Sequence, residues 1–181
     1  MLPADLPTVA LWGIPARLPR AAGGAGQGGY WEWIGVTLDG VGPVAVFDPD
    51  HACPPGFFGR PCRLAVELFQ PEVAPNPARR AAIEPQRPAA DPDAPPVVAG
   101  RVAGLHRHAW RYTGPVTSAE GGRRVVRHVL NAPQVTVRLV LDVGCGTLLA
   151  QLRDPALAPG VGEWVTLRGG RAELIAIELA A

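Results

Sequence analysis

The run VTVRLVL, residues 135–141, decides the fold class of this chain. Polar and apolar residues alternate in its first half, and β-branched residues are frequent, which is typical of a β-strand. Asp142 and two glycines follow, and a second apolar run comes next. We therefore expect strands near residues 135–142 and 146–152, joined by a tight turn.

Similar short runs occur in the N-terminal third. YWEWIGVTL, residues 30–38, stops at Asp39-Gly40, and VAVF, residues 44–47, follows Gly42-Pro43. Two such runs separated by turn residues predict a hairpin. CRLAVELF, residues 62–69, is predicted to be a half-buried strand with its leucines and Val66 on one face.

The C-terminal half reads in the same way. Further strands are expected near residues 109–117, 123–130, 163–168 and 171–179. Gly169 and Gly170 separate the last two runs, and a two-residue Gly-Gly loop between alternating runs is typical of a β-hairpin.

Composition agrees with a chain of strands and turns. The 181 residues include 22 glycines and 21 prolines, and both residue types interrupt helices. We predict a mainly β protein with one or two small barrels, similar to oligonucleotide-binding (OB) or SH3-like barrels, because closure removes exposed strand edges. A single larger barrel or a sandwich is the alternative.

Residues 71–97 differ from the rest, because eight prolines alternate there with alanine and charged residues. This composition favours extended segments and disfavours ladder pairing. We therefore predict an N-terminal β unit at residues 1–70, a proline-rich linker or strap at 71–97, and a C-terminal β-barrel unit at 98–181.

The two β units share an order of sequence marks. In each, Leu-Asp (38–39 and 141–142) is followed by a glycine turn, a strand, Asp-Pro, Pro-Gly, a further glycine and another strand. This order is consistent with duplication of a small β unit. Chance recurrence of turn residues is the alternative.

Residues 140–147, VLDVGCGT, resemble the first motif of the S-adenosylmethionine-dependent methyltransferases. The resemblance implies an enzyme in which a strand, a glycine-rich loop and a helix hold the cofactor. The chain departs from the pattern at Leu148, where the family usually has a third glycine, and only 34 residues follow Thr147. We interpret the motif instead as a hairpin turn whose glycines adopt positive φ.

Metal-ligand side chains occur in two places. His51, Cys53 and Cys62 lie close in the sequence, but their spacing matches no common zinc pattern. His106 and His108 would point the same way on a strand, yet no third ligand lies nearby. We predict no metal site and no cofactor.

No catalytic set is predicted either. Ser118 lacks a nucleophile-elbow context, and Cys145 has no adjacent base. Asp39 and Asp142 occupy matching places and could pair as acid and base, although aspartate before a glycine turn is ordinary turn chemistry. We therefore expect a protein that is not an enzyme.

Charge is uneven along the chain. Residues 98–181 carry 10 arginines against 6 acids, a net +4, and the chain contains no lysine. Six arginines fall within residues 101–128, interleaved with aromatic and histidine residues, against one acid. The predicted binding face consists of Arg107, Trp110, Arg111, Arg123, Arg124 and Arg127.

These observations predict a non-enzymatic binding module that contacts a protein partner through this face. Single-stranded nucleic acid is the alternative partner, since guanidinium groups pair with phosphates and rings stack on bases; the net charge of +1 is small for such a role. The chain has no stretch of 18 apolar residues, no signal-peptide pattern and few cysteines. We expect a cytoplasmic protein without a membrane partner.

Overall fold

The computed structural model describes residues 10–17, 33–48, 50, 52–84, 96–110, 113–120, 123–130 and 134–180. These residues form strands and two single turns of 3-10 helix, η1 (Pro55–Phe57) and η2 (Pro155–Leu157). The mainly β prediction is confirmed. Among the described residues, no helix has the length and apolar character needed to span a membrane.

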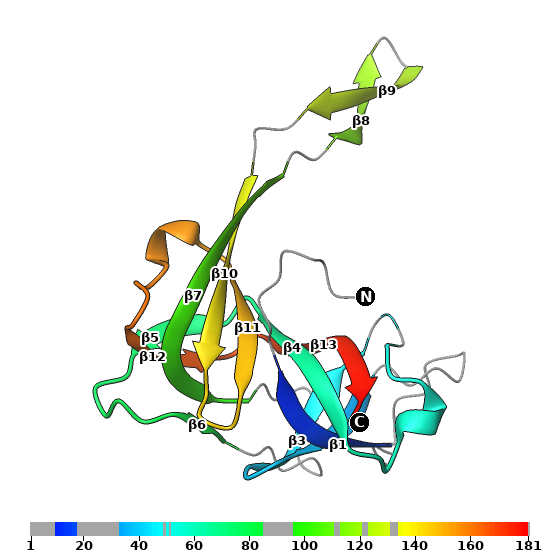
Figure 1. The fold of residues 1–181 in the computed structure, drawn as a ribbon. Helices are drawn as coiled ribbons and strands as arrows, with labels where there is room; N and C mark the ends of the chain where they lie inside the picture. The colour runs from blue at the N-terminus through cyan, green and yellow to red at the C-terminus, as the bar shows by residue number, and fades with distance from the viewer. Residues whose placement is uncertain are drawn as a thin grey trace.

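Five strands close into a barrel (Figure 1). β2 pairs with β1 and β3, β13 pairs with β3 and β4, and β4 returns to β1, so the ladder has no free edge. The five are β1 (Leu11–Arg17), β2 (Trp33–Leu38), β3 (Gly42–Phe47), β4 (Cys62–Phe69) and β13 (Arg171–Leu179). The predicted barrel and the predicted hairpin between β2 and β3 are both confirmed.

A second group of strands continues the sheet from β4. Its order is β11, β10, β7, β12 and β5, and β11 runs parallel to the last residues of β4. The bounds are β5 (Glu72–Pro75), β7 (Val98–Trp110), β10 (Gln134–Asp142), β11 (Thr147–Leu152) and β12 (Trp164–Arg168). β5 follows β4 directly in the chain, so the backbone joins the two ends of this row of strands, but among the described strands no ladder closes it and β5 remains an edge strand.

The two groups repeat one pairing scheme. β1 pairs antiparallel with β2 and β4, and β2 with β3; in the same way, β7 pairs antiparallel with β10 and β12, and β10 with β11. A short 3-10 helix precedes the last strand of each set. This correspondence supports the duplication read from the sequence marks.

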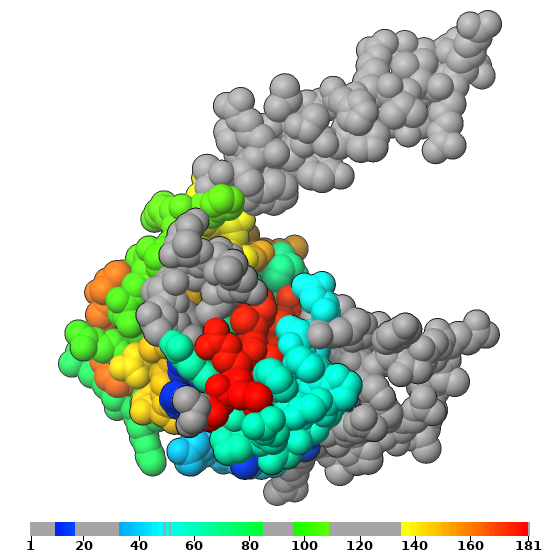
Figure 2. All heavy atoms as spheres, turned by 45° about the vertical axis from the view of Figure 1, so that its right-hand side comes forward, coloured from blue at the N-terminus to red at the C-terminus, as the bar shows by residue number. Residues whose placement is uncertain are grey.

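The two sequence units are interlocked in space. β13, from the C-terminal range, completes the barrel of the N-terminal range, and β5 from the strap pairs with β12. In Figure 2 the red C-terminal residues lie against the cyan and blue-green residues of the first half. The domain boundaries after residues 70 and 97 stay a prediction, but one cluster of buried apolar residues includes members of both units, from Leu11 to Leu174.

β4 is buried on both faces, which corrects the prediction of a half-buried strand. Leu64, Val66 and Leu68 are buried as expected, and Ala65 and Glu67 on the other face are buried too. The second face is covered by side chains from neighbouring strands: Leu149 and Glu173 lie directly opposite Glu67 in the register, and Arg138 donates a hydrogen bond to its carboxylate.

The strap contains ladder strands, contrary to the expectation for residues 71–97. β5 pairs with β12, and β6 (Ala82–Ile83) pairs with β7. β5 is an edge strand that ends at Pro75, and proline is tolerated at such positions because no ladder donor is needed there. Residues 85–95 of the strap lie outside the described residues.

The expected hairpin at Gly169-Gly170 is wrong. β12 pairs with β7 and β5, whereas β13 pairs with β3 and β4. The two glycines have φ of 70° and 76°, as in a tight turn, but they pass the chain from one strand group to the other. A local turn signal does not specify which partner a strand takes.

The methyltransferase-like motif forms the turn between β10 and β11, as we interpreted it. Gly144 and Gly146 have positive φ, and the Gly144 N–H donates to Oδ1 of Asp142 at 2.9 Å. Thr147 begins a strand, not a helix. The turn also anchors β1, since the Thr147 N–H donates to the carbonyl of Ala10.

Candidate functional site

The predicted arginine face is divided between two sheets. Arg107 is exposed on β7, opposite Val137 of β10, and Trp110 ends β7 opposite Gln134. The other described members belong to β9 (Arg123–Leu130), where Arg123, Arg124 and Arg127 lie opposite Glu120, Ala119 and Val116 of β8 (Thr113–Glu120). Arg111 lies outside the described residues.

β8 and β9 form a two-stranded sheet of their own. In Figure 1 this hairpin lies beyond the ends of β7 and β10, which form a long two-stranded ribbon leading to it. Among the strands that the structure describes, none pairs with the outer edge of β8 or of β9. Both edges therefore present a row of backbone N–H and C=O groups with which a strand of another chain could form hydrogen bonds.

The β7–β10 ribbon next to the hairpin carries several polar side chains, some of them exposed. His106 and His108 lie opposite Arg138 and Thr136, and Arg107 and His108 are exposed. No group of three or more metal-ligand side chains occurs within the described ranges. His51, which the sequence places near Cys53 and Cys62, lies outside the described residues.

The three cysteines are free thiols. Burial, followed by the charges of Asp48 and Cys62, raises the pKa of the Cys53 thiol from 9.0 to about 11. Burial also raises the pKa of Cys62 and of Cys145, and for Cys145 the charges of Asp39 and Asp142 add to the increase. A thiol with a raised pKa is a poor nucleophile near neutral pH, because the thiolate is the reactive form.

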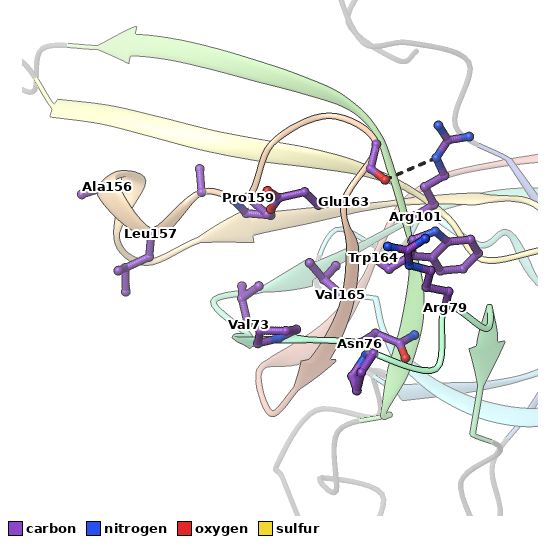
Figure 3. Close-up of a pocket in the computed structure, with 14 residues that line it drawn as sticks. Val73, Asn76, Arg79, Arg101, Ala156, Leu157, Pro159, Glu163, Trp164 and Val165 are labelled. Carbon is purple, nitrogen blue, oxygen red and sulfur yellow. Dashed lines mark hydrogen bonds between the residues drawn. The ribbon is translucent and has the colours of Figure 1, made fainter.

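A pocket that the sequence did not predict lies on the second strand group (Figure 3). Its volume is about 930 Å³, within the range of small-molecule sites. The lining comes from β5 and the loop after it, β7, η2 and β12. The residues that carry its chemistry are Asn76, Arg79, Arg101, Leu157, Glu163 and Trp164.

Arg101 and Trp164 are direct cross-strand neighbours on β7 and β12. Such neighbours have side chains on the same face of the sheet, about 5 Å apart at Cβ. Figure 3 draws Arg79 at the same end of the pocket, and Leu157 at the opposite end. The pocket thus has a cationic and aromatic end and an apolar end.

Sequence reasoning missed this pocket for a clear reason. Arg79 belongs to the proline-rich strap, which we expected to be a linker, and Arg101 was counted only as part of a basic run. Their proximity depends on the pairing of β5 with β12, which no local pattern specifies. The only signal was the arginine pair inside the strap.

A comparison of the chain with protein-family models, with curated proteins and with solved structures finds no match. The functional argument therefore depends on the geometry and charge of this molecule.

Proposed function

We propose that the protein is a non-enzymatic binding module whose β8–β9 hairpin, with the adjoining β7–β10 ribbon, contacts a protein partner. The observation that supports this most is the separate two-stranded sheet. A lone hairpin is marginally stable in water, and three arginine positions lie on one of its two strands.

Strand addition fits such a hairpin. A partner strand that pairs with an outer edge gains main-chain hydrogen bonds, and side chains on both partners then decide specificity. β9 carries three arginines and β8 carries one acid, Glu120, so an acidic partner surface would complement the hairpin.

The test compares proteins captured by the wild-type chain with those captured by Arg123→Glu/Arg124→Glu. We expect at least one partner to be recovered about tenfold less by this variant, because charge reversal turns attraction into repulsion. Arg60→Glu/Arg153→Glu, which changes the same charge at two exposed positions of the body, is the matched control. If both variants retain every partner equally, the proposal fails.

Single-stranded nucleic acid is the second candidate, because the same arginines could bind phosphates. Fluorescence anisotropy with short single-stranded DNA and RNA distinguishes the two. Micromolar binding that weakens steeply with salt and is lost in Arg123→Glu/Arg124→Glu would favour nucleic acid, since counterion release makes phosphate binding salt-dependent. The methyltransferase-like reading of residues 140–147 is not favoured, because a strand begins at Thr147, where that family has a helix.

A further inference from the structure

The pocket on the second strand group holds two guanidinium groups from different elements. Arg79 comes from the loop after β5, and Arg101 comes from β7. Arg101 donates through Nε to the carbonyl of Gly162 at 3.4 Å, which leaves its terminal nitrogens available. Within the described ranges, neither arginine forms an ion pair with a carboxylate.

The loop that carries Arg79 is built by a buried asparagine. Asn76 is 8% exposed; its N–H donates to the carbonyl of Trp164, and its Nδ2 donates to the carbonyl of Arg80 at 3.0 Å. The Arg79 N–H donates back to the carbonyl of Asn76. These bonds hold Arg79 at a φ of 49°, which costs a non-glycine residue free energy. Strained backbone of this kind is concentrated at binding sites.

The first strand group offers an internal comparison. There the cross-strand pair that corresponds to Arg101 and Trp164 is Trp12 and Arg63, with the two residue types exchanged. Arg63 lies near a carboxylate, with 4.0 Å between one of its terminal nitrogens and Oε2 of Glu178 of β13. In the second group the corresponding position lies one residue beyond the β5–β12 ladder and holds the uncharged Asn76, whose N–H donates to the carbonyl of Trp164. The second group therefore has an uncharged amide beside the pocket at the position where the first group has the carboxylate of Glu178.

We propose that this pocket binds a small organic oxyanion that carries a flat ring. Arg79 and Arg101 bind the oxyanion by charge-assisted hydrogen bonds, which are the stronger kind. The indole of Trp164 stacks on the ring. The apolar end at Leu157 and Val73 contacts the rest of the ligand. Oε2 of Glu163 accepts a hydrogen bond from the N–H of Gly160, and its other oxygen accepts one from a ligand hydroxyl or amine.

Two ligand sources share this chemistry, aromatic carboxylates and ring-bearing phosphates. The probes are indole-3-acetate and adenosine 5′-monophosphate, each titrated to about 10 mM. A dissociation constant above about 10 mM is too weak to count as a binding site. The readout is the indole N–H signal of Trp164 in the ¹H–¹⁵N spectrum of the full chain, assigned by comparison with Trp164→Phe.

We expect at least one probe to shift this signal in a saturable manner. Arg79→Gly and Arg101→Gln should each weaken that probe by about tenfold or more, through loss of a charged hydrogen bond. Glycine at position 79 keeps the positive φ without strain, so the loop is preserved. Arg80→Ala removes the same charge one residue away, outside the pocket lining, and should bind like the wild type.

Saturation by indole-3-acetate alone assigns carboxylates, saturation by the nucleotide alone assigns phosphates, and saturation by both assigns the shared oxyanion. If neither probe shifts the signal, or if Arg79→Gly and Arg101→Gln bind both probes as the wild type does, the proposal is overturned. Because none of these residues lies on the hairpin, the result is independent of the partner proposed above.

Discussion

Glu67 on β4 is a buried acid, 3% exposed, and its carboxylate accepts hydrogen bonds from Nε of Arg138 at 2.7 Å and from a terminal nitrogen at 3.4 Å. Burial raises its pKa, whereas the charge and hydrogen bonds of Arg138 lower it, and Glu173 raises it further. This ion pair connects two strands that are not adjacent in the sheet, β4 and β10, across β11.

Arg138→Met should lower the free energy of unfolding by about 3 kcal/mol at pH 8, because it leaves a buried carboxylate without its partner. Without Arg138 the pKa of Glu67 rises further. The folded state then binds a proton that the unfolded state has released, so stability is recovered as the pH falls through the folded-state pKa.

Urea denaturation of the wild type and of Arg138→Met at pH 8 and at pH 5 measures this effect, and the difference between the two proteins should be smaller at pH 5. A difference that does not change with pH would contradict it. Arg63→Met is the control, because its partner Glu178 is 70% exposed, and an exposed pair contributes less than about 1 kcal/mol.

At the residue scale, alternation predicted which apolar residues of β4 are buried, but it could not predict Glu67. An acid in an alternating run reads as solvent-facing. Glu67 is buried because the other half of the chain supplies the side chains around it. Leu149 and Glu173 lie directly opposite Glu67 on β11 and β13, and Arg138 of β10 donates a hydrogen bond to its carboxylate.

At the element scale, the sequence predicted most strands but missed β7, most of which lies before the expected strand at residues 109–117. It predicted local partners, as for β2 with β3 and β10 with β11, but not distant ones. The hairpin of β2 and β3 is local, so its turn residues sufficed. β12 and β13 are also separated by a two-glycine turn, yet their partners lie in different strand groups. Pairing over long sequence separations depends on tertiary packing, which turn chemistry does not encode.

The two glycines of this turn should respond differently to alanine. Both have positive φ, so each substitution carries the left-handed cost of about 1 kcal/mol. A Cβ at Gly169 meets open space, whereas a Cβ at Gly170 would collide with the carbonyl of Phe69 and approach the backbone nitrogen of Pro71.

We therefore expect Gly170→Ala to cost roughly 2 kcal/mol more than Gly169→Ala in the free energy of unfolding, a typical penalty for overpacking. Thermal and urea denaturation of the two variants measure the difference. Equal losses would show that the β12–β13 connection does not pack against the bend between β4 and β5.

At the scale of the whole molecule, the sequence marks suggested two similar β units, and the strand pairings correspond one to one. What the marks could not reveal is the exchange: β13 completes the first group, and the β4–β5 segment completes the second. The pocket depends on that exchange, since Asn76 and Arg79 reach β12 only through β5.

The arginine positions, by contrast, were readable as a basic run, because charge is a property of sequence. The sequence did not show that these arginines divide between an exposed position on β7 and a hairpin outside the main sheet. The proposed function requires that this hairpin carry the binding while the interlocked body supports it.

The most direct test is to measure partner capture by a chain in which residues 111–133 are replaced by Asn-Gly, a two-residue turn that suits the paired ends of β7 and β10. The variant should unfold within about 3 °C of the wild type, since the buried core lies in the body, and should lose the partners that Arg123→Glu/Arg124→Glu loses. Full retention of those partners by the folded variant would contradict the account.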